Sequence, residues 1–165
     1  TLKKSIIKMM DRLSPKQIIV VSSAPQIRYP DCYGIDMANL EGLVAFKAAL
    51  SLLRDSNRYH IVNDIYSRCK SQADLPDNEV ENFVKEIYAP FKPQQISDKI
   101  AQLLTDESIN AKVKIIFQPI ENLHLACPKN LGDWYFTGNY PTPGGNRVVN
   151  RAFINFFEGN KERAY

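Results

Sequence analysis

Two short apolar runs constrain the fold of this chain more than any other feature. The first is QIIVV at residues 17–21, and the second is VKIIF at residues 113–117. A nearly unbroken run of β-branched residues is typical of a parallel strand that is covered on both faces. Two such strands cannot form a stable sheet alone, because their outer edges would carry unpaired backbone groups. The sequence therefore predicts an α/β fold with a parallel sheet, some of whose strands lie outside residues 1–165.

Most of the remaining chain shows helical periodicity. Apolar residues recur at helical spacing in the first 13 residues, in four segments between about residues 38 and 104, and in the tail. The stripes are Leu2, Ile6, Met9, Met10 and Leu13; Leu40, Leu43, Val44 and Ala48; Ile61, Val62, Ile65, Tyr66 and Cys69; Val80, Phe83, Val84 and Ile87; Ile96, Ile100, Leu103 and Leu104; and Val148, Val149, Ala152, Phe153, Phe156 and Phe157. Asp77 is placed to cap the fourth stripe. A short helix is expected at residues 119–126.

The first helix also indicates that upstream sequence completes the sheet. A helix that feeds a parallel strand is normally preceded by another strand and by the loop that joins them. We therefore expect that strand and loop before Thr1. Because ligands of open α/β sheets bind beyond the carboxyl ends of the strands, residues 1–165 would hold half of a site.

Composition narrows the classes of partner and compartment. The net charge is +3, but basic and acidic residues are interleaved, so the sequence does not favour a nucleic-acid partner. No apolar run approaches the roughly 20 residues that a membrane helix needs, and no signal peptide opens the chain, so a cytoplasmic protein is expected. The three cysteines have no metal-ligand spacing, so the sequence predicts neither a disulfide framework nor a metal site.

Residues 22–37, SSAPQIRYPDCYGIDM, lie directly after the first predicted strand and should border the ligand crevice. Arg28 could pair with a phosphate, Asp36 could orient a hydroxyl or a cation, and Gly34 would permit a tight turn. Two alternatives stay open. The loop could simply turn the chain, with Arg28 in solvent and its tyrosines half-buried, or Arg28 could pair with Asp36 and fix the loop.

The string SSAPQIRYPDCYGID, continued by M-x-x-x-E-x-L-V-A, resembles a specific family segment. It is similar to the residues that follow the phosphoribosyl-pyrophosphate (PRPP) loop in amidophosphoribosyltransferases. Thr1 and Leu2 resemble the end of that loop, typically Asp-Asp-Ser-Ile-Val-Arg-Gly-Thr-Thr, and its continuation into a helix. The pattern F-T-G-x-Y-P-T at residues 136–142 resembles the C-terminal portion of the same family.

The resemblance implies a partial phosphoribosyltransferase-type, Rossmann-like sheet with a largely helical insertion and a C-terminal helical tail. Residues 1–47 and 105–165 would belong to the C-terminal part of the phosphoribosyltransferase domain, and residues 48–104 would form the mostly helical insertion. The insertion is longer than the corresponding stretch of the family. It could be a cap on the sheet, an interface or filler, and its apolar stripes favour one of the first two.

The parent enzyme that the resemblance implies is a glycosyltransferase of purine biosynthesis, which makes 5-phosphoribosylamine from PRPP and glutamine. Its partners would be PRPP, purine nucleotides, the glutaminase domain of the same chain and further copies in a homo-oligomer. Its magnesium ligands would lie upstream of Thr1. Within this chain the residues placed nearest substrate are Thr1, Arg28 and Tyr29, none of them catalytic, so the isolated fragment is expected to be inactive.

Some members of the family hold an iron–sulfur cluster, but Gly132 and Tyr135 stand where a Cys-x-x-Cys pair would lie, so no cluster is expected. His60 and His124 are interpreted as structural, and Gly144 and Gly145 as a turn. The alternative to an enzyme fragment is a stand-alone interaction or regulatory module that uses the helical insertion to bind a protein.

Overall fold

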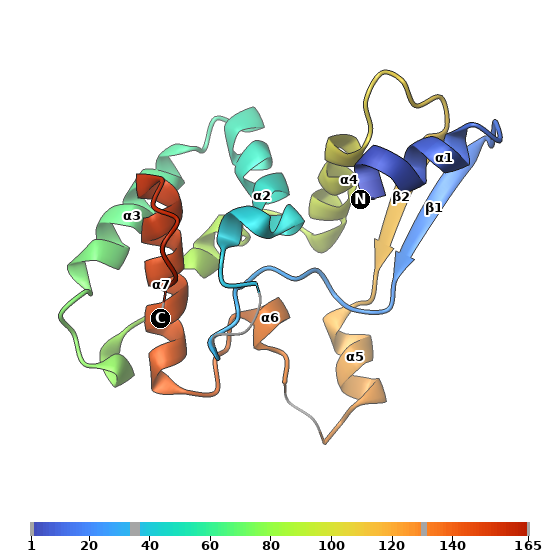
Figure 1. Cartoon of the computed structure of the whole chain (residues 1–165). Coiled ribbons are helices and arrows are strands. Elements are labelled where there is room, and N and C mark those ends of the chain that lie inside the picture. The colour runs from blue at the N-terminus through green and yellow to red at the C-terminus, as the bar shows by residue number, and fades with distance from the viewer. Residues whose placement is uncertain (1, 34–36, 130–131, 165) are drawn as a thin grey trace.

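A computed structural model describes residues 2–33, 37–129 and 132–164. Its sheet has two parallel strands, β1 (Gln17–Ser22) and β2 (Lys112–Phe117), paired in register from Gln17 opposite Lys112 to Ser22 opposite Phe117. Figure 1 shows the strands at one end of the molecule, beside α1 (Ile7–Asp11) and α4 (Pro93–Leu104). Both predicted strands and their parallel pairing are confirmed, so the fold is mixed α/β.

Only one face of this sheet is covered. Ile18 and Ile115 are buried against residues of α1 and α4, which pack on the same side. On the opposite face Ile19 is 52% exposed and Val21 is 70% exposed. Among the described residues no element packs on the second face, so the prediction that both faces are covered stays a prediction about the larger domain.

The first helix differs in detail from its prediction. A π-helical turn, η1 (Leu2–Ile6), precedes α1 and changes the rotation of the side chains that follow. As a result Ile7 is buried on the sheet, whereas Met9 and Met10 of the predicted stripe are exposed. The carboxylate of Asp11 accepts hydrogen bonds from the backbone N–H groups of Asn110 and Ala111, at 3.1 and 2.8 Å. This contact ties the end of α1 to the start of β2.

The other end of the molecule is a helical core. Its helices are α2 (Val44–Asp55), α3 (His60–Ser71) and α7 (Pro143–Glu158). The single turn η2 (Leu40–Gly42) packs against α2 and α7, and α4 packs against α2. Phe46 of α2 and Phe153 of α7 are fully buried and pack edge to face, with ring centroids 6.3 Å apart. These helices confirm four of the predicted stripes. Because α7 packs on α3, the C-terminal tail and the predicted insertion share one core.

The stripe at residues 80–87 does not form an α-helix. One 3₁₀ turn, η3 (Asp77–Glu79), precedes the stripe and a second, η4 (Phe83–Ile87), lies within it, with extended backbone at Val80 between the two. The side-chain amide of Gln72 bonds both the N–H and the C=O of Glu81, which holds this backbone outside a helix. Asn82, not Asp77, caps the second turn by accepting a bond from the N–H of Val84. The predicted cap is therefore wrong.

Two short helices complete the chain. The predicted helix after β2 is confirmed as α5 (Ile120–Ala126), and α6 (Trp134–Thr137) forms one turn within the tail loop. Gly144 and Gly145, interpreted above as a turn, instead lie in the first turn of α7. In the part of the chain that the structure describes, every helix is too short or too polar to cross a bilayer.

Candidate functional site: a crevice at the carboxyl ends of the strands

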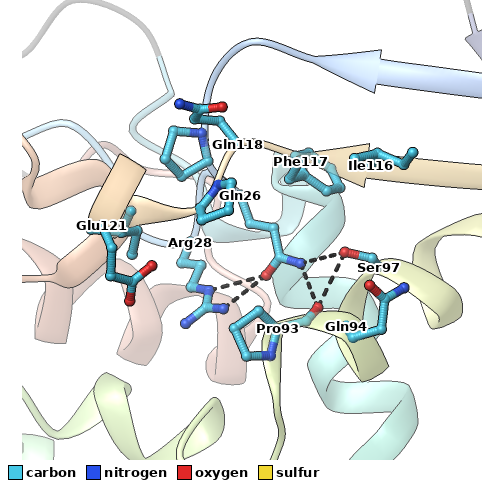
Figure 2. Close-up of a pocket in the computed structure, with 12 residues that line it drawn as sticks. Gln26, Arg28, Pro93, Gln94, Ser97, Ile116, Phe117, Gln118 and Glu121 are labelled. Carbon is cyan, nitrogen blue, oxygen red and sulfur yellow. Dashed lines mark hydrogen bonds between the residues drawn. The ribbon is translucent and has the colours of Figure 1, made fainter. Parts of the chain in front are cut away.

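A cavity of about 480 Å³ lies where both strands end (Figure 2). Three segments line it: the loop after β1, the residues that end and follow β2, and the first turns of α4. The residues are Pro25, Gln26 and Arg28; Ile116, Phe117, Gln118, Pro119, Ile120 and Glu121; and Pro93, Gln94 and Ser97. A second cavity of about 360 Å³ shares Pro25, Gln26 and Phe117 with it and is lined mainly by apolar residues. The crevice is therefore at the edge of the sheet that the sequence predicted.

Gln26 anchors the loop beneath this cavity. Its side chain is only 4% exposed and donates hydrogen bonds of 2.8 Å to the backbone oxygen of Pro93 and to Oγ of Ser97, both on α4. The oxygen of the same amide accepts bonds from Arg28, 3.2 Å from Nε and 2.9 Å from Nη2. Gln26 thus connects the guanidinium of Arg28 to the start of α4.

The backbone of Arg28 is held from two further elements. Its N–H donates to the carbonyl oxygen of Tyr135 at 2.8 Å, and its own carbonyl oxygen accepts a 2.6 Å bond from the hydroxyl of Tyr88. The guanidinium carbon lies 5.4 Å from the centre of the Tyr88 ring, within range of a cation–π contact. The loop after β1, the helical region at residues 48–104 and the C-terminal tail therefore all hold Arg28 in place.

The charge of Arg28 is available to the cavity. Arg28 forms no salt bridge with any of the described residues, and Glu121 is the one carboxylate among the cavity-lining residues. An arginine carries five N–H donors, and the bonds to Gln26 leave donors free for a ligand. A planar guanidinium of this kind binds carboxylate or phosphate oxygens in a bidentate manner.

Tyr29 does not line the cavity. It is 3% exposed, and its ring packs edge to face on Tyr88 with centroids 5.4 Å apart. Burial raises the pKa of its hydroxyl above the ordinary value. Its backbone N–H shares the carbonyl oxygen of Tyr135 with Arg28. In this structure Tyr29 supports the loop from the core side, so its predicted contact with substrate stays a prediction.

The two sequence motifs that carry the family resemblance lie against each other. Tyr140 donates a 2.8 Å bond to the carbonyl oxygen of Pro30, and Tyr135 donates a 2.9 Å bond to the carboxylate of Asp31. Gly138 has a φ of +71°, and a Cβ at this position would lie 2.8 Å from the Tyr29 ring. The motif glycine is therefore required both by its backbone conformation and by close packing.

Three of the predicted positions cannot be placed. Thr1, Gly34 and Asp36 lie outside the described residues, so neither the contact of Thr1 with substrate nor the pairing of Arg28 with Asp36 is tested. The sequence also missed a partner for His124, whose Nε2 lies 2.9 Å from a carboxylate oxygen of Asp133. This pair joins α5 to the start of α6. No group of three or more potential ligands among the described residues could hold a metal ion.

Comparison with known proteins gives two partial similarities. The chain is 30% identical over 91 residues to the amidophosphoribosyltransferase of Schizosaccharomyces pombe (strain 972 / ATCC 24843), a stretch that covers 52% of this chain and 17% of that protein. It is 41% identical over 46 residues to the amidophosphoribosyltransferase of Haemophilus influenzae (strain ATCC 51907 / DSM 11121 / KW20 / Rd), covering 28% and 9%. No family model and no solved structure matches. The chain is thus similar, over part of its length, to two much longer transferases.

Proposed function

We propose that this chain is the C-terminal part of the phosphoribosyltransferase domain of an amidophosphoribosyltransferase. The proposed parent enzyme is a cytoplasmic glycosyltransferase that makes 5-phosphoribosylamine from PRPP and glutamine in purine biosynthesis. The observation that carries this proposal is Arg28, a rigidly held cation at the carboxyl ends of two parallel strands, in a chain similar to such transferases. Parallel sheets bind their ligands at this edge.

The chemistry assigned to the parent requires several groups acting together. Displacement of pyrophosphate from PRPP needs donors aimed at the leaving group and a cation that neutralises its charge. Arg28 offers such donors, since its guanidinium faces the cavity with no salt bridge to the described residues. Following the family resemblance, we assign the magnesium ligands and the PRPP loop of the parent enzyme to sequence upstream of residue 1.

The uncovered face of the sheet also fits a partial domain. Ile19, Val21 and Ile116 form an apolar strip of neighbouring residues on β1 and β2. The strip faces away from α1 and α4, which cover the other side. In the proposed parent, further parts of a phosphoribosyltransferase-type domain would cover this strip and pair with the free edge of β1. Burial of such a strip stabilises a domain by roughly 25 cal/mol per Å² of apolar surface.

The decisive experiment begins with the coding sequence upstream of residue 1. The proposal expects an in-frame acidic pair and glycine loop there, and expects the longer protein to form phosphoribosylamine from PRPP and glutamine in the presence of magnesium. The isolated 165-residue chain is expected to form none from PRPP, magnesium and ammonia. A start codon directly before residue 1, with a folded and inactive product, would instead support the stand-alone interaction module.

A further inference from the structure

We propose that the helical region between the strands positions the anion-binding arginine of the crevice, with Gln26 and Tyr88 as its positioning residues. This inference rests on the proposed function, since it requires that Arg28 binds an anionic group of the substrate. It assigns a role to the long helical stretch that the family resemblance leaves without one. The stretch would be neither filler nor only a cap, because two of its elements bond directly to the arginine or to its anchor.

The first link runs through α4. Gln26 is nearly fully buried. The oxygen of its amide accepts hydrogen bonds from Arg28, and the nitrogen donates to Pro93 and Ser97, so the amide connects the arginine to α4. Ser97 in turn donates to the backbone oxygen of Pro93 at 3.1 Å, which fixes the hydroxyl that Gln26 contacts. A neutral amide is well suited to this position, because it orients the guanidinium without neutralising its charge, as a carboxylate would.

The second link runs through Tyr88, which directly follows η4 and is its C-cap. Tyr88 is 3% exposed, its hydroxyl bonds the carbonyl oxygen of Arg28, and its ring lies beside the guanidinium. Backbone and side chain of Arg28 are thus both contacted by one residue of the helical region. An arginine fixed before the ligand arrives loses little side-chain entropy on binding, which is the benefit of preorganisation.

The test is a titration of the 165-residue chain and of each variant with inorganic pyrophosphate. Isothermal titration calorimetry gives the dissociation constant of every variant, and nuclear magnetic resonance at the Nε–H group of Arg28 reports contact with the arginine in the chains that keep it. This resonance is assigned by its disappearance in Arg28→Lys. Arg28→Ala is expected to weaken pyrophosphate binding by roughly tenfold or more. Gln26→Met keeps the size of the side chain but loses the hydrogen bonds of Gln26 to α4 and to Arg28. It is expected to weaken pyrophosphate binding by roughly five- to tenfold. Tyr88→Phe keeps the ring and is expected to weaken binding by about threefold.

Matched controls separate positioning from stability. Gln72 is also a buried glutamine, and it bonds backbone groups of a residue that does not line the cavity, so Gln72→Met loses comparable bonds. Tyr140→Phe removes a hydroxyl that bonds Pro30 in the same loop, two residues from Arg28. Both controls should bind pyrophosphate like the wild type. In an Arg28→Ala background, Gln26→Met should have no further effect on binding.

Each outcome has a defined meaning. If the wild type does not bind pyrophosphate, or Arg28→Ala binds equally well, the anion site of the proposed function fails and this inference fails with it. If Arg28→Ala weakens binding while Gln26→Met and Tyr88→Phe bind like their controls, the arginine site stands and the positioning role is refuted. Additive losses in the double variant of Arg28 and Gln26 would also refute it, since independent effects add.

Discussion

The hydroxyl of Tyr88 donates a 2.6 Å hydrogen bond to the carbonyl oxygen of Arg28, which lies 60 residues earlier in the chain. This bond crosses from the helical region to the loop after β1. Together with the bonds of Gln26 and Tyr135, it holds Arg28 in place from the loop itself, the helical region and the C-terminal tail. The cavity is therefore a product of the tertiary fold, although its position was predictable from the end of a strand.

The pair Gly144 and Gly145 gives a direct test of packing at the start of α7. A Cβ on Gly145 would overlap the side chain of Tyr140, whereas a Cβ on Gly144 would lie 3.5 Å from the nearest atom, on Asp77. Gly145→Ala should therefore lower the free energy of unfolding by about 1–3 kcal/mol. Gly144→Ala should leave it within about 1 kcal/mol of the wild-type value. Urea denaturation measures both, and equal effects would contradict the packing described here.

Because its thiol is buried, Cys69 should make the free energy of unfolding fall as the pH rises in the alkaline range. Burial raises the pKa of its thiol to about 12 from the ordinary value of 9.0. The unfolded chain therefore loses this proton before the folded chain does, and stability contributed by the neutral thiol falls as the pH rises from about 9 towards 12. Cys69→Ala should flatten the loss of unfolding free energy between about pH 8.5 and 9.5, where a tyrosine with the ordinary pKa of about 10 is still mostly neutral. Cys127→Ala, at an exposed site, should retain the wild-type slope. Parallel slopes for wild type and Cys69→Ala would show that the thiol is not buried.

The bare face of the sheet predicts self-association of the isolated chain. Ile19 and Val21 are exposed on β1, whose free edge can also pair with another strand. Analytical ultracentrifugation should find species larger than a monomer. The double substitution Ile19→Thr and Val21→Thr should shift these species towards monomer. Leu125→Thr, at an even more exposed apolar site on α5, serves as the control and should not. A wild-type chain that stays monomeric at high micromolar concentration would contradict this prediction.

Much of the local structure follows from sequence patterns because short-range forces determine it. The β-branched run at residues 17–21 forms β1, and the stripe after Pro93 forms α4, as predicted. The predictions failed where a distant partner decides. Gln72 holds the backbone of Glu81 extended and prevents the expected helix. Which face of the sheet α1 and α4 cover also depends on tertiary packing, which no local pattern specifies.

The candidate site shows the same division. Its position followed from the general rule for parallel strands, and Arg28 was identified there by residue type alone. The anchors of Arg28 were not predictable, because a buried glutamine and a tyrosine remote in sequence carry no signal of their own. The acidic partner of His124, only nine residues away, was likewise missed because the intervening loop has no periodicity.

The most direct test of the central claim is the Michaelis constant for PRPP in the parent enzyme carrying Arg28→Ala. Arg54→Ala is the matched control, since Arg54 also lies over a tyrosine ring, at 4.7 Å from Tyr59, but does not line the crevice. If Arg28 binds a phosphate group of the substrate, its removal should raise the Michaelis constant by roughly tenfold or more, while Arg54→Ala leaves it unchanged. A Michaelis constant for PRPP that is the same in Arg28→Ala and in wild type would contradict the account.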